Sequence, residues 1–467
     1  MVKLIPQEIL DIYKKLTQAN FEVFLVGGCV RNMLLKKPVK DWDMTTNATP
    51  QDLLKIFKEG FYDNKFGTVG IPVILGSVSD SRIDSGQARM TQKIVVEVTT
   101  FRTEKGYSDN RRPDKVEWGK SIEEDLARRD FTINAIALKL TTDLIDPFDG
   151  QKDIKNKIIR AVGNPKERFK EDALRLLRAV RIATELSFTI EEKTRIEIIA
   201  DAPFIAKVSG ERIRIELLRI LESDSAYEGV MLLKNSNLLN YILPELMEGV
   251  GISQKRPGRH HVDDVFTHNV LSLKFCSSKD PIVRLAALLH DVGKPKVMGK
   301  DEEGLVIFYN HEVAGAQIAR EICDRFKFSR KERDKIVNLI RWHMFTVDEK
   351  LSDAGIRRFI RRIGVENVKD MMDIRIGDRL GGGTQTAESW RLKLFKKRIE
   401  EQLKPLPFSI NDLAIDGNDI IKELNLKPGP KIGEILQKLF LEVDEDLSKN
   451  NKEFLLKRTR ELYSATA

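Results

Sequence analysis

Two aspartates flank one tryptophan in the segment KDWDMTTNATP, which begins at Lys40. Alternate residues of a strand point to the same face, so the carboxylates of Asp41 and Asp43 would project together. They would repel each other unless a cation lay between them. The segment is therefore either a polar turn or half of a metal site. Carboxylate oxygens at this spacing suit Mg²⁺, which also takes substrate phosphates as ligands.

A third carboxylate is expected near this pair, because two-metal phosphoryl transfer needs one. Glu97 lies inside the apolar run KIVVEVTTF. It is the candidate, because a glutamate in the core of a strand is costly when it is left unpaired. The alternative is an edge strand with Glu97 facing solvent. Together the three carboxylates predict a catalytic centre for phosphoryl transfer.

A glycine pair precedes the aspartates. The run FEVFLV predicts a buried strand that leads into Gly27 and Gly28, and CVRNMLL predicts a short helix after them. Glycines there let a triphosphate approach the backbone, and the helix N-terminus offers free N–H groups to it. Arg31 can add a bidentate phosphate contact. Glycine pairs also serve tight strand–helix turns for steric reasons alone, so the order of neighbouring segments decides between the two explanations.

The elements that must position these residues change character along the chain. Up to about Leu140, GTVGIPVILG and KIVVEVTTF predict strands, QDLLKIFKEG predicts a helix, and the polar residues 79–92 predict a loop. TTDLIDPFDGQKD combines Pro, Gly and Asp and predicts a hinge. Beyond it apolar residues recur at i, i+3 and i+4, as in ERFKEDALRLLRAVRIATEL, so the remainder is mostly helical.

The composition limits the functional classes. The 467 residues, 41% hydrophobic and 32% charged, suit about three domains of a globular protein. No apolar run is long enough for a bilayer span. The amphipathic start MVKLIPQEILDIYKKL is not a signal peptide, so we expect a cytoplasmic protein with no membrane partner. Three dispersed cysteines indicate neither a disulfide framework nor a zinc knuckle, and the net charge of +8 favours a polyanionic partner.

Five segments resemble the motif series of the class II tRNA nucleotidyltransferases and bacterial poly(A) polymerases, in the family's order and spacing. They cover roughly the first 180 residues and read LVGGCVRNMLL, DWD, VEVTTFR, LARRDFTINAIAL and EDALRLLRAVRIA. The resemblance implies an α+β fold, with a small mixed-sheet nucleotidyltransferase head similar to DNA polymerase β, then an all-helical neck and body. One departure is Asn32, where the family usually has an aspartate.

The resemblance also implies roles for residues of the head. Asp41 and Asp43 would hold Mg²⁺, with Glu97 as the third catalytic carboxylate. The nucleotide-binding residues it implies are Gly28 and Arg31 at the triphosphate, Arg129 at the bound nucleotide and Asp130 at the ribose. Without this context, Arg129 and Asp130 would be interpreted as a solvated helix start with Asp130 as its N-cap.

The predicted helix ERFKEDALRLLRAVR carries a candidate base selector. Glu171, Arg175 and Arg178 fall on one face of this helix, and Asp172 precedes Arg175 by three residues. The simple explanation is a salt-bridge ladder on an exposed helix. The alternative follows from base chemistry, because the Watson–Crick edges of cytosine and adenine each offer an amino donor beside a ring-nitrogen acceptor.

Guanine and uracil present the opposite order of donor and acceptor. One carboxylate with one guanidinium would therefore accept CTP and ATP and reject GTP and UTP without a template. In the family this is the role of the EDxxR motif, which implies Asp172 and Arg175 here. Arg178 and Arg181, one and two turns further on, would serve the phosphates or the edge of the base.

Residues 99–119 (TTFRTEKGYSDNRRPDKVEWG) predict a polar, basic loop. In the family the corresponding loop assists the switch from C to A addition, and enzymes that add only CC lack it. The resemblance therefore implies either the full CCA reaction or A addition.

The chain has only six histidines. His260 and His261 adjoin in the segment KRPGRHHVDD, where we expect a linker whose histidines contact solvent or RNA. The others are spread over predicted helices, and Asp291 directly follows His290. Dispersed imidazoles and carboxylates suit a transition-metal site that activates water, although a lone histidine in a helix is usually a packed or capping residue.

This pattern resembles the HD phosphohydrolase domain, which occurs in the C-terminal half of one branch of these nucleotidyltransferases. The resemblance implies a divalent transition metal whose identity it does not fix. The implied core ligands are His268, His290, Asp291 and Asp378, and the candidates for a second metal are His311 and His343. The packing explanation survives for His311 or His343 taken singly.

Together these patterns divide the chain into four parts. They are a catalytic head at 1–140, a helical neck and body at 141–258 for nucleotide selection and RNA binding, an HD domain at 259–385 and a basic helical tail at 386–467. The implied function is template-independent addition of CCA to the 3′ end of tRNA from CTP and ATP, with an accessory phosphohydrolase activity. The alternatives are a poly(A) polymerase, a partial enzyme that adds only CC or A, a protein uridylyltransferase with an HD domain, and an RNA-binding protein with an inactive head.

Overall fold

The computed structural model describes residues 5–62, 67–75, 92–105, 115–119, 121–140, 144–254, 264–403 and 409–464. The chain divides into two compact units. The first consists of Met1–Met247 with Arg325–Phe328, and the second of Glu248–Asp324 with Ser329–Ala467. The four-part division stays a prediction. Residues 79–91 of the predicted loop, and the linker histidines His260 and His261, lie outside the described residues.

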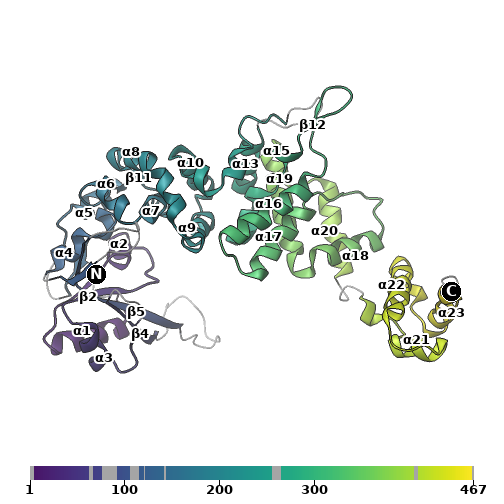
Figure 1. Ribbon diagram of the computed structural model, residues 1–467, viewed down its shortest axis with the longest axis horizontal. Helices are drawn as coiled ribbons and strands as arrows, with labels where there is room; N and C mark the ends of the chain where they lie inside the picture. The colour runs from purple at the N-terminus through teal and green to yellow at the C-terminus, as the bar shows by residue number, and fades with distance from the viewer. Residues whose placement is uncertain are drawn as a thin grey trace. The chain divides into compact units, whose positions relative to one another are not determined.

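The first unit is built around a mixed sheet, as the sequence predicts for the head (Figure 1). In the described part of the chain it has seven strands in the order β3-β4-β5-β2-β1-β8-β9. The β2–β5 pair is parallel and the other pairs are antiparallel. The strand bounds are β1 Val23–Val26, β2 Asp43–Thr46, β3 Phe61–Tyr62, β4 Thr68–Leu75, β5 Gln92–Thr100, β8 Ala137–Leu138 and β9 Leu144–Ile145.

Short helices surround this sheet, and local capping fixes where they begin. The α3 helix (Pro50–Ile56) begins after Thr49, whose hydroxyl accepts a hydrogen bond from the Asp52 backbone N–H, and Pro50 occupies its first turn. The other helices of the head are α1 Gln7–Gln18, α2 Gly28–Leu34 and α4 Ile122–Ala127. Both α1 and α3 contact β4 (Figure 1), and both bury apolar side chains, such as Ile9 and Leu53.

The predicted loop 99–119 is partly ordered as strands. Its flanks form β6 (Arg102–Lys105) and β7 (Lys115–Trp118), which pair as an antiparallel ribbon. Residues 106–114 lie outside the described residues. The prediction of a loop was therefore wrong for the two flanks. Their charged residues do not show the apolar runs that predict strands, and the two strands are recognised only by their pairing with each other.

A series of helices follows the sheet in the first unit. Their bounds are α5 Gly150–Asn156, α6 Pro165–Glu171, α7 Leu174–Leu186, α8 Glu192–Asp201, α9 Gly210–Glu222, α10 Ala226–Asn235, α11 Leu239–Ile242 and α12 Pro244–Met247. Two short parallel strands, β10 Ile158–Ile159 and β11 Thr189–Ile190, lie beside α7. This unit is helical after the sheet, as the sequence predicts.

The predicted continuous helix around Asp172 is broken into α6 and α7. Asp172 adopts an extended backbone with φ −146° and ψ 105°. Its carboxylate accepts a hydrogen bond from the backbone N–H of Leu174 at 3.0 Å. Aspartate side chains compete in this way for N–H groups that a continuous helix would use internally. Asp172 therefore lies at a junction of two helices and not on a helix face.

The second unit is helical in its described residues, apart from the small hairpin of β12 (Gly299–Lys300) and β13 (Val306–Ile307). Its helices are α13 Val265–Phe275, α14 Pro281–Leu289, α15 Lys294–Val297, α16 His311–Arg325, α17 Arg330–Trp342, α18 Asp353–Ile363, α19 Val368–Gly381, α20 Trp390–Gln402, α21 Gly417–Leu424, α22 Pro430–Glu445 and α23 Lys452–Ser464. The α16 helix ends at Arg325, which belongs to the first unit. None of the helices in the described part of the chain is both long and apolar enough to cross a membrane.

Two glycines let α13 and α19 approach each other closely. A Cβ atom on Gly377 would lie 2.5 Å from the carbonyl oxygen of Ser272, and one on Gly381 would lie 2.7 Å from the Ser272 backbone nitrogen. No side chain fits at either position without a shift of the backbone. The contact brings His268 on α13 near Asp378 on α19.

A buried ion-pair cluster connects α22 to α18. The carboxylate of Asp444 is fully buried and lies 2.9 Å from Nε of Arg357 and 2.5 Å from an Nη atom of Arg361. Burial raises the pKa of Asp444, but the two guanidiniums outweigh this and hold that pKa below its usual value. The cluster therefore stabilises the fold in the ionised form.

We expect Asp444→Asn to lower the free energy of unfolding by about 3–5 kcal/mol, because it leaves buried guanidinium charge without a partner. Chemical denaturation at neutral pH measures this loss. The depressed pKa means that the wild-type contribution is present at neutral pH and disappears as the pH falls through the folded-state pKa. The difference between the two proteins should therefore shrink in acid, and an equal difference at every pH would contradict the assignment.

Candidate functional sites

A hollow of about 930 Å³ opens beside the aspartate pair in the first unit. Residues from β2, α2, α7, α9 and the connecting segments line it. The predicted site residues in its wall are Gly28, Arg31, Asp41, Asp43, Arg178 and Arg181. The structure thus brings together candidate metal ligands and candidate phosphate ligands that lie far apart in the sequence.

The three predicted carboxylates lie close together in the sheet. Trp42 is buried, and Asp41 and Asp43 on either side of it both reach the hollow. Parallel pairing of β2 with β5 places Asp43 directly beside Glu97. The alternative for Glu97 is wrong about an edge strand, because β5 lies between β4 and β2. Its solvent-facing side chain is confirmed, because Glu97 is exposed, and the expectation of a buried position in the strand core is wrong.

The charge balance at Asp43 suits a cation. Burial raises the pKa of Asp43, Arg129 opposes this shift, and the neighbouring carboxylate of Asp41 adds to it. A carboxylate whose ionised form is disfavoured by burial and by a neighbouring carboxylate gains from a divalent ion that prefers oxygen ligands. The residues present therefore fit Mg²⁺.

The turn before α2 approaches these carboxylates closely. Gly27 has a φ of 73°, and a Cβ atom there would lie 2.9 Å from an Nη atom of Arg129. On α2 itself, Arg31 is nearly buried and donates hydrogen bonds to the side-chain oxygens of Asn32 and Asn134. Burial lowers the pKa of Arg31 to about 10, and the like charge of Arg181 adds to the shift.

Both side-chain acceptors that hold Arg31 are neutral amides. The departure at Asn32 therefore leaves the guanidinium without a carboxylate in direct contact among the described hydrogen bonds and ion pairs. Such a group gains from a bound polyphosphate, because the phosphate would supply the missing negative charge. Asn134 is a residue that the sequence analysis missed, although it lies within the RRDFTINAIAL segment.

Asp130 is held in place by several donors. Its carboxylate accepts hydrogen bonds from the backbone N–H of Phe131, from Asn134 and from both Nε and Nη2 of Arg178. Burial raises the pKa of Asp130, but Arg178 outweighs this and holds the pKa well below its usual range. Asp130 is therefore ionised and orients Arg178 towards the hollow. Arg181, which also lines the hollow, donates hydrogen bonds to the carboxylates of Glu216 and Glu185.

The structure does not pair the two expected base selectors with each other. Asp172 accepts two hydrogen bonds from Arg212 of α9, at 3.2 and 2.7 Å. Arg175 donates to Glu171 at 2.6 Å and to the backbone oxygens of Arg168 and Arg128. The ladder contact between Glu171 and Arg175 is thus present. Sequence reasoning missed Arg212, because no local spacing connects α9 to Asp172.

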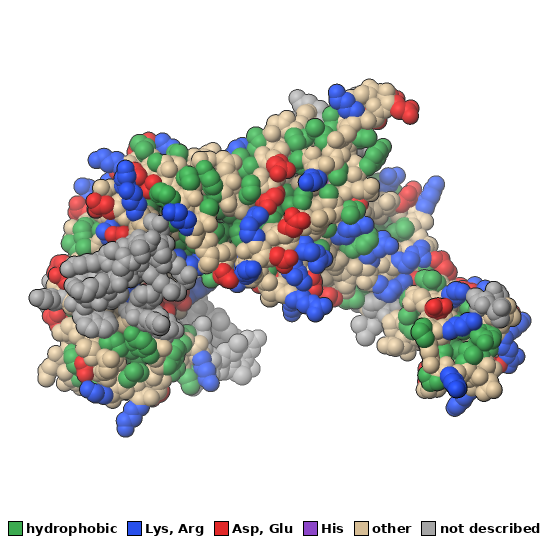
Figure 2. Space-filling view, viewed as in Figure 1, with side chains coloured by type: hydrophobic (Ala, Val, Ile, Leu, Met, Phe, Trp, Pro, Cys, Tyr) green, Lys and Arg blue, Asp and Glu red, His purple; other side chains and the backbone are tan. Residues whose placement is uncertain are grey.

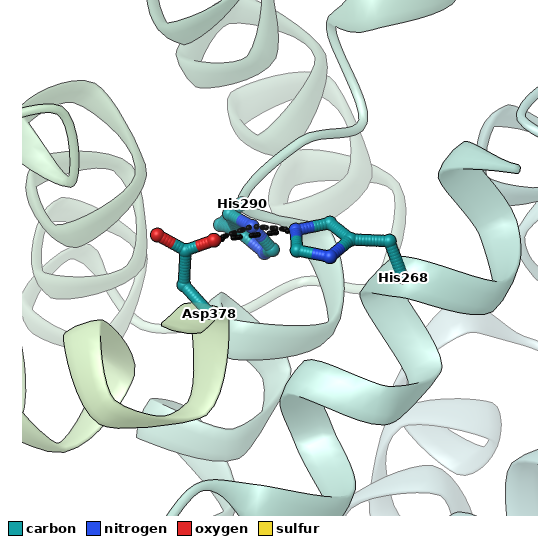
Figure 3. Close-up of side chains that lie close together, drawn as sticks. All are labelled: His268, His290 and Asp378. Carbon is teal, nitrogen blue, oxygen red and sulfur yellow. Dashed lines mark hydrogen bonds and ion pairs between the residues drawn. The ribbon is translucent and has the colours of Figure 1, made fainter. Parts of the chain in front are cut away.

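All six predicted ligands of the second site meet in the second unit. The four Nε2 atoms face one another, with His268 and His290 3.1 Å apart and His311 and His343 3.4 Å apart. Figure 3 shows His268, His290 and Asp378 converging from separate helices, and Asp378 Oδ1 lies 3.3 Å from His268 Nε2. The packing explanation for single histidines does not account for this convergence.

Asp291 lies between two groups of ligands. Its Oδ2 atom is 3.2 Å from His268 and 3.4 Å from His290, and its Oδ1 atom is 3.1 Å from His311 and 3.6 Å from His343. One carboxylate oxygen therefore faces each group. This arrangement can bridge two metal ions.

The outer contacts of the histidines fit metal binding. The Nδ1 atoms of His290, His311 and His343 lie 2.8, 2.8 and 2.7 Å from backbone carbonyl oxygens. An Nδ1–H that donates to a carbonyl leaves Nε2 as the free electron pair for a metal, which is the usual arrangement of histidine ligands. Sequence reasoning also missed Gly293, where a Cβ atom would lie 2.1 Å from the His311 carbonyl oxygen, so only glycine lets this turn approach α16.

The charges of the histidine–aspartate cluster also favour metal binding. Burial lowers the pKa of His290, but Asp291 and Asp378 outweigh burial and raise it to about 10. The same contacts hold the pKa of Asp291 well below its usual range, although burial alone would raise it. The carboxylates thus favour protons on His268 and His290, whose pKa values are both raised, and a divalent ion would replace those protons.

A second hollow, of about 530 Å³, opens onto this cluster. Asp291, His311, His343 and Asp378 form part of its wall. Lys294 and Arg375 add positive charge to the wall, and each pairs with a ligand carboxylate, Lys294 with Asp291 and Arg375 with Asp378. Such a hollow suits an anionic substrate such as a phosphate ester.

Comparison with known proteins extends these findings. Three family models match the chain: "Poly A polymerase head domain" at residues 23–160, "Probable RNA and SrmB- binding site of polymerase A" at 187–249, and "tRNA nucleotidyltransferase domain 2 putative" at 301–458. The chain is similar to the CCA-adding enzyme of Limosilactobacillus reuteri, with 31% identity over 97% of this chain and 95% of the relative. The CCA-adding enzyme of Geobacillus stearothermophilus is 30% identical over 97% of each chain.

Solved structures show the same fold. The Bacillus stearothermophilus CCA-adding enzyme in complex with CTP matches with a TM-score of 0.68 and 26% identity, covering 98% of each chain. The Thermotoga maritima CCA-adding enzyme complexed with tRNA matches with a TM-score of 0.57 and 19% identity, covering 99% of this chain and 97% of that one. The similarity to the second structure shows the fold alone.

Proposed function

Because the chain belongs to the family of CCA-adding enzymes, we propose that it adds C, C and A in turn to the 3′ end of tRNA, using CTP and ATP. The observation that carries the proposal is the meeting of Asp41, Asp43 and the basic residues Arg31 and Arg178 around one hollow. The relatives act as CCA-adding enzymes and the head residues needed for nucleotidyl transfer are present. With tRNA, CTP and ATP as substrates, we place the reaction in the cytoplasm.

In the proposed reaction, the terminal 3′-hydroxyl oxygen of the RNA bonds to the α-phosphorus of the nucleotide. The bond from that phosphorus to the bridging oxygen breaks, pyrophosphate leaves, and the hydroxyl proton passes to solvent. Arg31 and Arg178 bind the triphosphate, and Asp130 orients Arg178. Mg²⁺ held by Asp41, Asp43 and Glu97 would favour ionisation of the hydroxyl and neutralise the leaving group.

For nucleotide choice we retain Asp172 and Arg175 as the base-reading residues. In the structure Arg212 donates two hydrogen bonds to the carboxylate of Asp172. Arg212 is therefore a positioning residue: it holds the carboxylate of Asp172 at the junction of α6 and α7 in one orientation. The fixed main-chain and Glu171 contacts of Arg175 hold the guanidinium in the same way.

We expect Arg212→Gln to weaken selection of CTP and ATP over UTP and GTP by about tenfold in kcat/KM, which corresponds to one lost oriented hydrogen bond of about 1.4 kcal/mol. Single-nucleotide addition with each triphosphate measures the ratio. Arg195→Gln is the matched control, because Arg195 pairs only with neighbouring Glu192 on an exposed helix face. A variant with unchanged selectivity would remove Arg212 from the mechanism.

The direct test of the reaction uses three tRNA acceptors, ending before CCA, after the first C and after CC. Each is offered every labelled nucleoside triphosphate singly and in combination. Addition of two C and one A, with GTP and UTP refused, supports the proposal. An unbounded A tail would make the protein a poly(A) polymerase, and addition of CC alone or A alone would make it a partial enzyme. Transfer of UMP to a protein would favour a signalling uridylyltransferase.

The helical parts are proposed to bind the phosphates of tRNA. Basic segments such as RRFIRRIG and RLKLFKKRIEEQL lie on α18 and α20. In the first of them Arg357 and Arg361 pair with Asp444 inside the fold, so its remaining arginines would make the phosphate contacts. Figure 2 shows Lys and Arg side chains interspersed with Asp and Glu on the visible face, so the net charge of +8 is not sorted into one patch there. Phosphate contacts of this kind weaken as salt rises.

The cluster of histidines and aspartates in the second unit supports a second activity. We propose that the residues implied by the HD resemblance hold two divalent transition-metal ions and that the site hydrolyses a phosphate ester, as a phosphatase or a 2′,3′-cyclic phosphodiesterase. The oxygen of a water molecule would bond to phosphorus, the ester P–O bond would break, and the leaving alcohol would take a proton. Asp291 supports the proposal, because it offers one oxygen to each ligand group.

A further inference from the structure

One face of the sheet in the first unit carries exposed apolar side chains beside the catalytic carboxylates. They are Phe61 on β3, Pro72 and Ile74 on β4, and Val95 on β5. A single exposed apolar residue is common, but four on adjoining strands form a patch, and such patches mark binding surfaces. We call these four residues the β3–β5 face. None of them lines the hollow beside the aspartates, so the triphosphate contacts proposed above do not use them.

The strand register joins the β3–β5 face to the carboxylates. Phe61 pairs with Gly70, and Gly70 pairs with Glu97. Glu97 in turn pairs with Asp43. Paired residues of neighbouring strands lie on the same face of a sheet, and Val95 shares that face because it is two residues from Glu97. One row therefore runs across four strands, from an aromatic ring to the candidate metal ligands.

A glycine lets the Phe61 ring lie directly on the sheet. A Cβ atom on Gly70 would lie 2.7 Å from Cζ of Phe61 and 3.0 Å from a methyl carbon of Val95. The ring therefore occupies the position that a side chain of β4 would take beside Glu97, and 45% of Phe61 remains exposed. A flat, exposed ring next to a catalytic carboxylate is a surface on which a nucleic-acid base can stack.

The reaction proposed for the aspartates places its two substrates on opposite sides of them, because the attacking and leaving oxygens lie roughly in line through the phosphorus. The triphosphate ligands Gly28 and Arg31 lie on α2, which follows β1, and β1 borders β2 on one side. The β5 strand borders β2 on the other side (Figure 1). The attacking 3′-hydroxyl therefore approaches from the side of Glu97 and the β3–β5 face.

The far end of the β3–β5 face offers a cation for an RNA backbone. Lys93 pairs with Ile74 and lies on the same face as Glu97, four residues before it. At about 3.3 Å per residue, it is about 13 Å from Glu97 along β5. Lys93 is exposed and has no carboxylate partner within the described part of the chain. A phosphate group of an RNA strand that ends at Glu97 would supply that partner.

We propose that the β3–β5 face binds the 3′-terminal nucleotide of the acceptor RNA, with its base stacked on Phe61 and its 3′-hydroxyl beside Glu97. The proposal rests on the nucleotidyl transfer proposed above and names the residues that hold the second substrate. Stacking on a ring tolerates any base, because every base has an aromatic face. Such a contact suits an acceptor whose last nucleotide changes after each addition.

Removal of the terminal base tests this contact. Two acceptor tRNAs end after the first C, one with cytidine and one with an abasic ribose at that last position, and both keep the 3′-hydroxyl. Single-turnover addition of CMP is measured with each at a low acceptor concentration. We expect the wild type to add to the cytidine acceptor about tenfold faster, within the lower range of base–aromatic stacking. In Phe61→Leu this ratio should fall at least about fivefold, because the ring and the base act as a pair.

Two variants separate stacking from folding. Phe61→Tyr keeps an aromatic ring and should keep the wild-type ratio. Tyr62→Leu is the matched control and should also keep it, because Tyr62 is the next residue of β3, is 46% exposed and points to the opposite face. An equal loss of rate with both acceptors in Phe61→Leu would show a structural role and overturn the proposal. A wild type that does not distinguish the two acceptors would overturn it as well.

Photo-cross-linking distinguishes failure of this proposal from failure of the proposed function. An acceptor tRNA with 5-iodocytidine as its last nucleotide is irradiated with the full-length protein and Mg²⁺, and the adducts are located by mass spectrometry. We expect adducts on residues 61–62, 70–75 or 93–97. Adducts there without addition of any nucleotide would refute the CCA-adding function and leave the RNA-end site standing. Normal addition with adducts confined to other parts of the chain would do the reverse.

A second copy of this chain is the other occupant that an apolar sheet face could take. Light scattering of the wild type and of Phe61→Leu, both without RNA, tests for it. A dimer that dissociates in Phe61→Leu would assign the β3–β5 face to self-association and overturn the proposal. An equal mass for both proteins supports the RNA end as the occupant.

Discussion

Replacement of Asp43 by alanine should lower the rate of nucleotide addition by at least about a thousandfold, because removal of a ligand for an ion that stabilises the transferring phosphoryl group costs several kcal/mol. Asp43 lies directly beside Glu97 in the parallel pair and in the wall of the hollow. Single-turnover addition of CMP to a tRNA lacking CCA measures the effect. The tRNA affinity should stay close to that of the wild type, because the lost group acts on the reacting phosphate.

Two controls separate this effect from loss of folding. Asp52→Asn changes an aspartate of the same head that lies in the first turn of α3 and pairs with Lys55 near the surface, and it should keep at least half of the wild-type rate. Hydrolysis at the second site should be the same in Asp43→Ala as in the wild type. Full nucleotide addition by Asp43→Ala would revive the interpretation as an RNA-binding protein with an inactive head.

Replacement of Asp291 by asparagine should abolish the second activity and leave the first intact. One oxygen of Asp291 faces each group of candidate ligands, so both proposed metal positions would lose a ligand at once. We expect hydrolysis of phosphate esters to fall at least about a thousandfold, and metal analysis by mass spectrometry should show loss of both ions. Addition of CCA should change by less than about twofold, since two independent sites do not couple.

The matched comparison is His343→Ala, which removes a ligand from one group only. It should lose one of the two ions and retain the other. Asp324→Asn, an exposed aspartate on α16, should retain both. Loss of CCA addition together with hydrolysis in Asp291→Asn, in protein that remains folded by circular dichroism, would contradict the separation of the sites.

The strands of the head could be predicted because their signal is local. Continuous apolar runs such as residues 23–26 and 94–96 leave little choice but a buried or half-buried strand. The register that places Asp43 beside Glu97 could not be predicted, because parallel partners are joined by a long connection. The sequence left the exposure of Glu97 open, because alternation along β5 is hidden when valines occupy both faces.

The region of the candidate base-reading residues, 171–178, shows what helical spacing alone cannot predict. Glu171, Arg175 and Arg178 have helical spacing, and one of the expected contacts, Glu171 to Arg175, is present. The spacing gave no sign that Asp172 would take a backbone N–H and end the helix. The partner of Asp172, Arg212, lies 40 residues further along, and only the packing of α7 against α9 reveals it.

The second site could be predicted as a set only through resemblance. Its six ligands span residues 268 to 378 and come from five helices or helix ends, so no local pattern links them. What the sequence does carry is the His290-Asp291 pair followed by Gly293. The structure gives the reason for that glycine, because the His311 carbonyl oxygen occupies the space where a side chain would begin.

The glycines of α19 have a consequence for the inheritance of the proposed phosphohydrolase activity. A random-mutagenesis screen that selects for its loss would recover changes at Gly377 and Gly381 as well as at the ligands, because any side chain there collides with Ser272 on the neighbouring helix. Such alleles would keep every ligand intact and still separate His268 from Asp378. A gene could therefore lose this activity by one codon change that no inspection of its metal-binding residues would reveal.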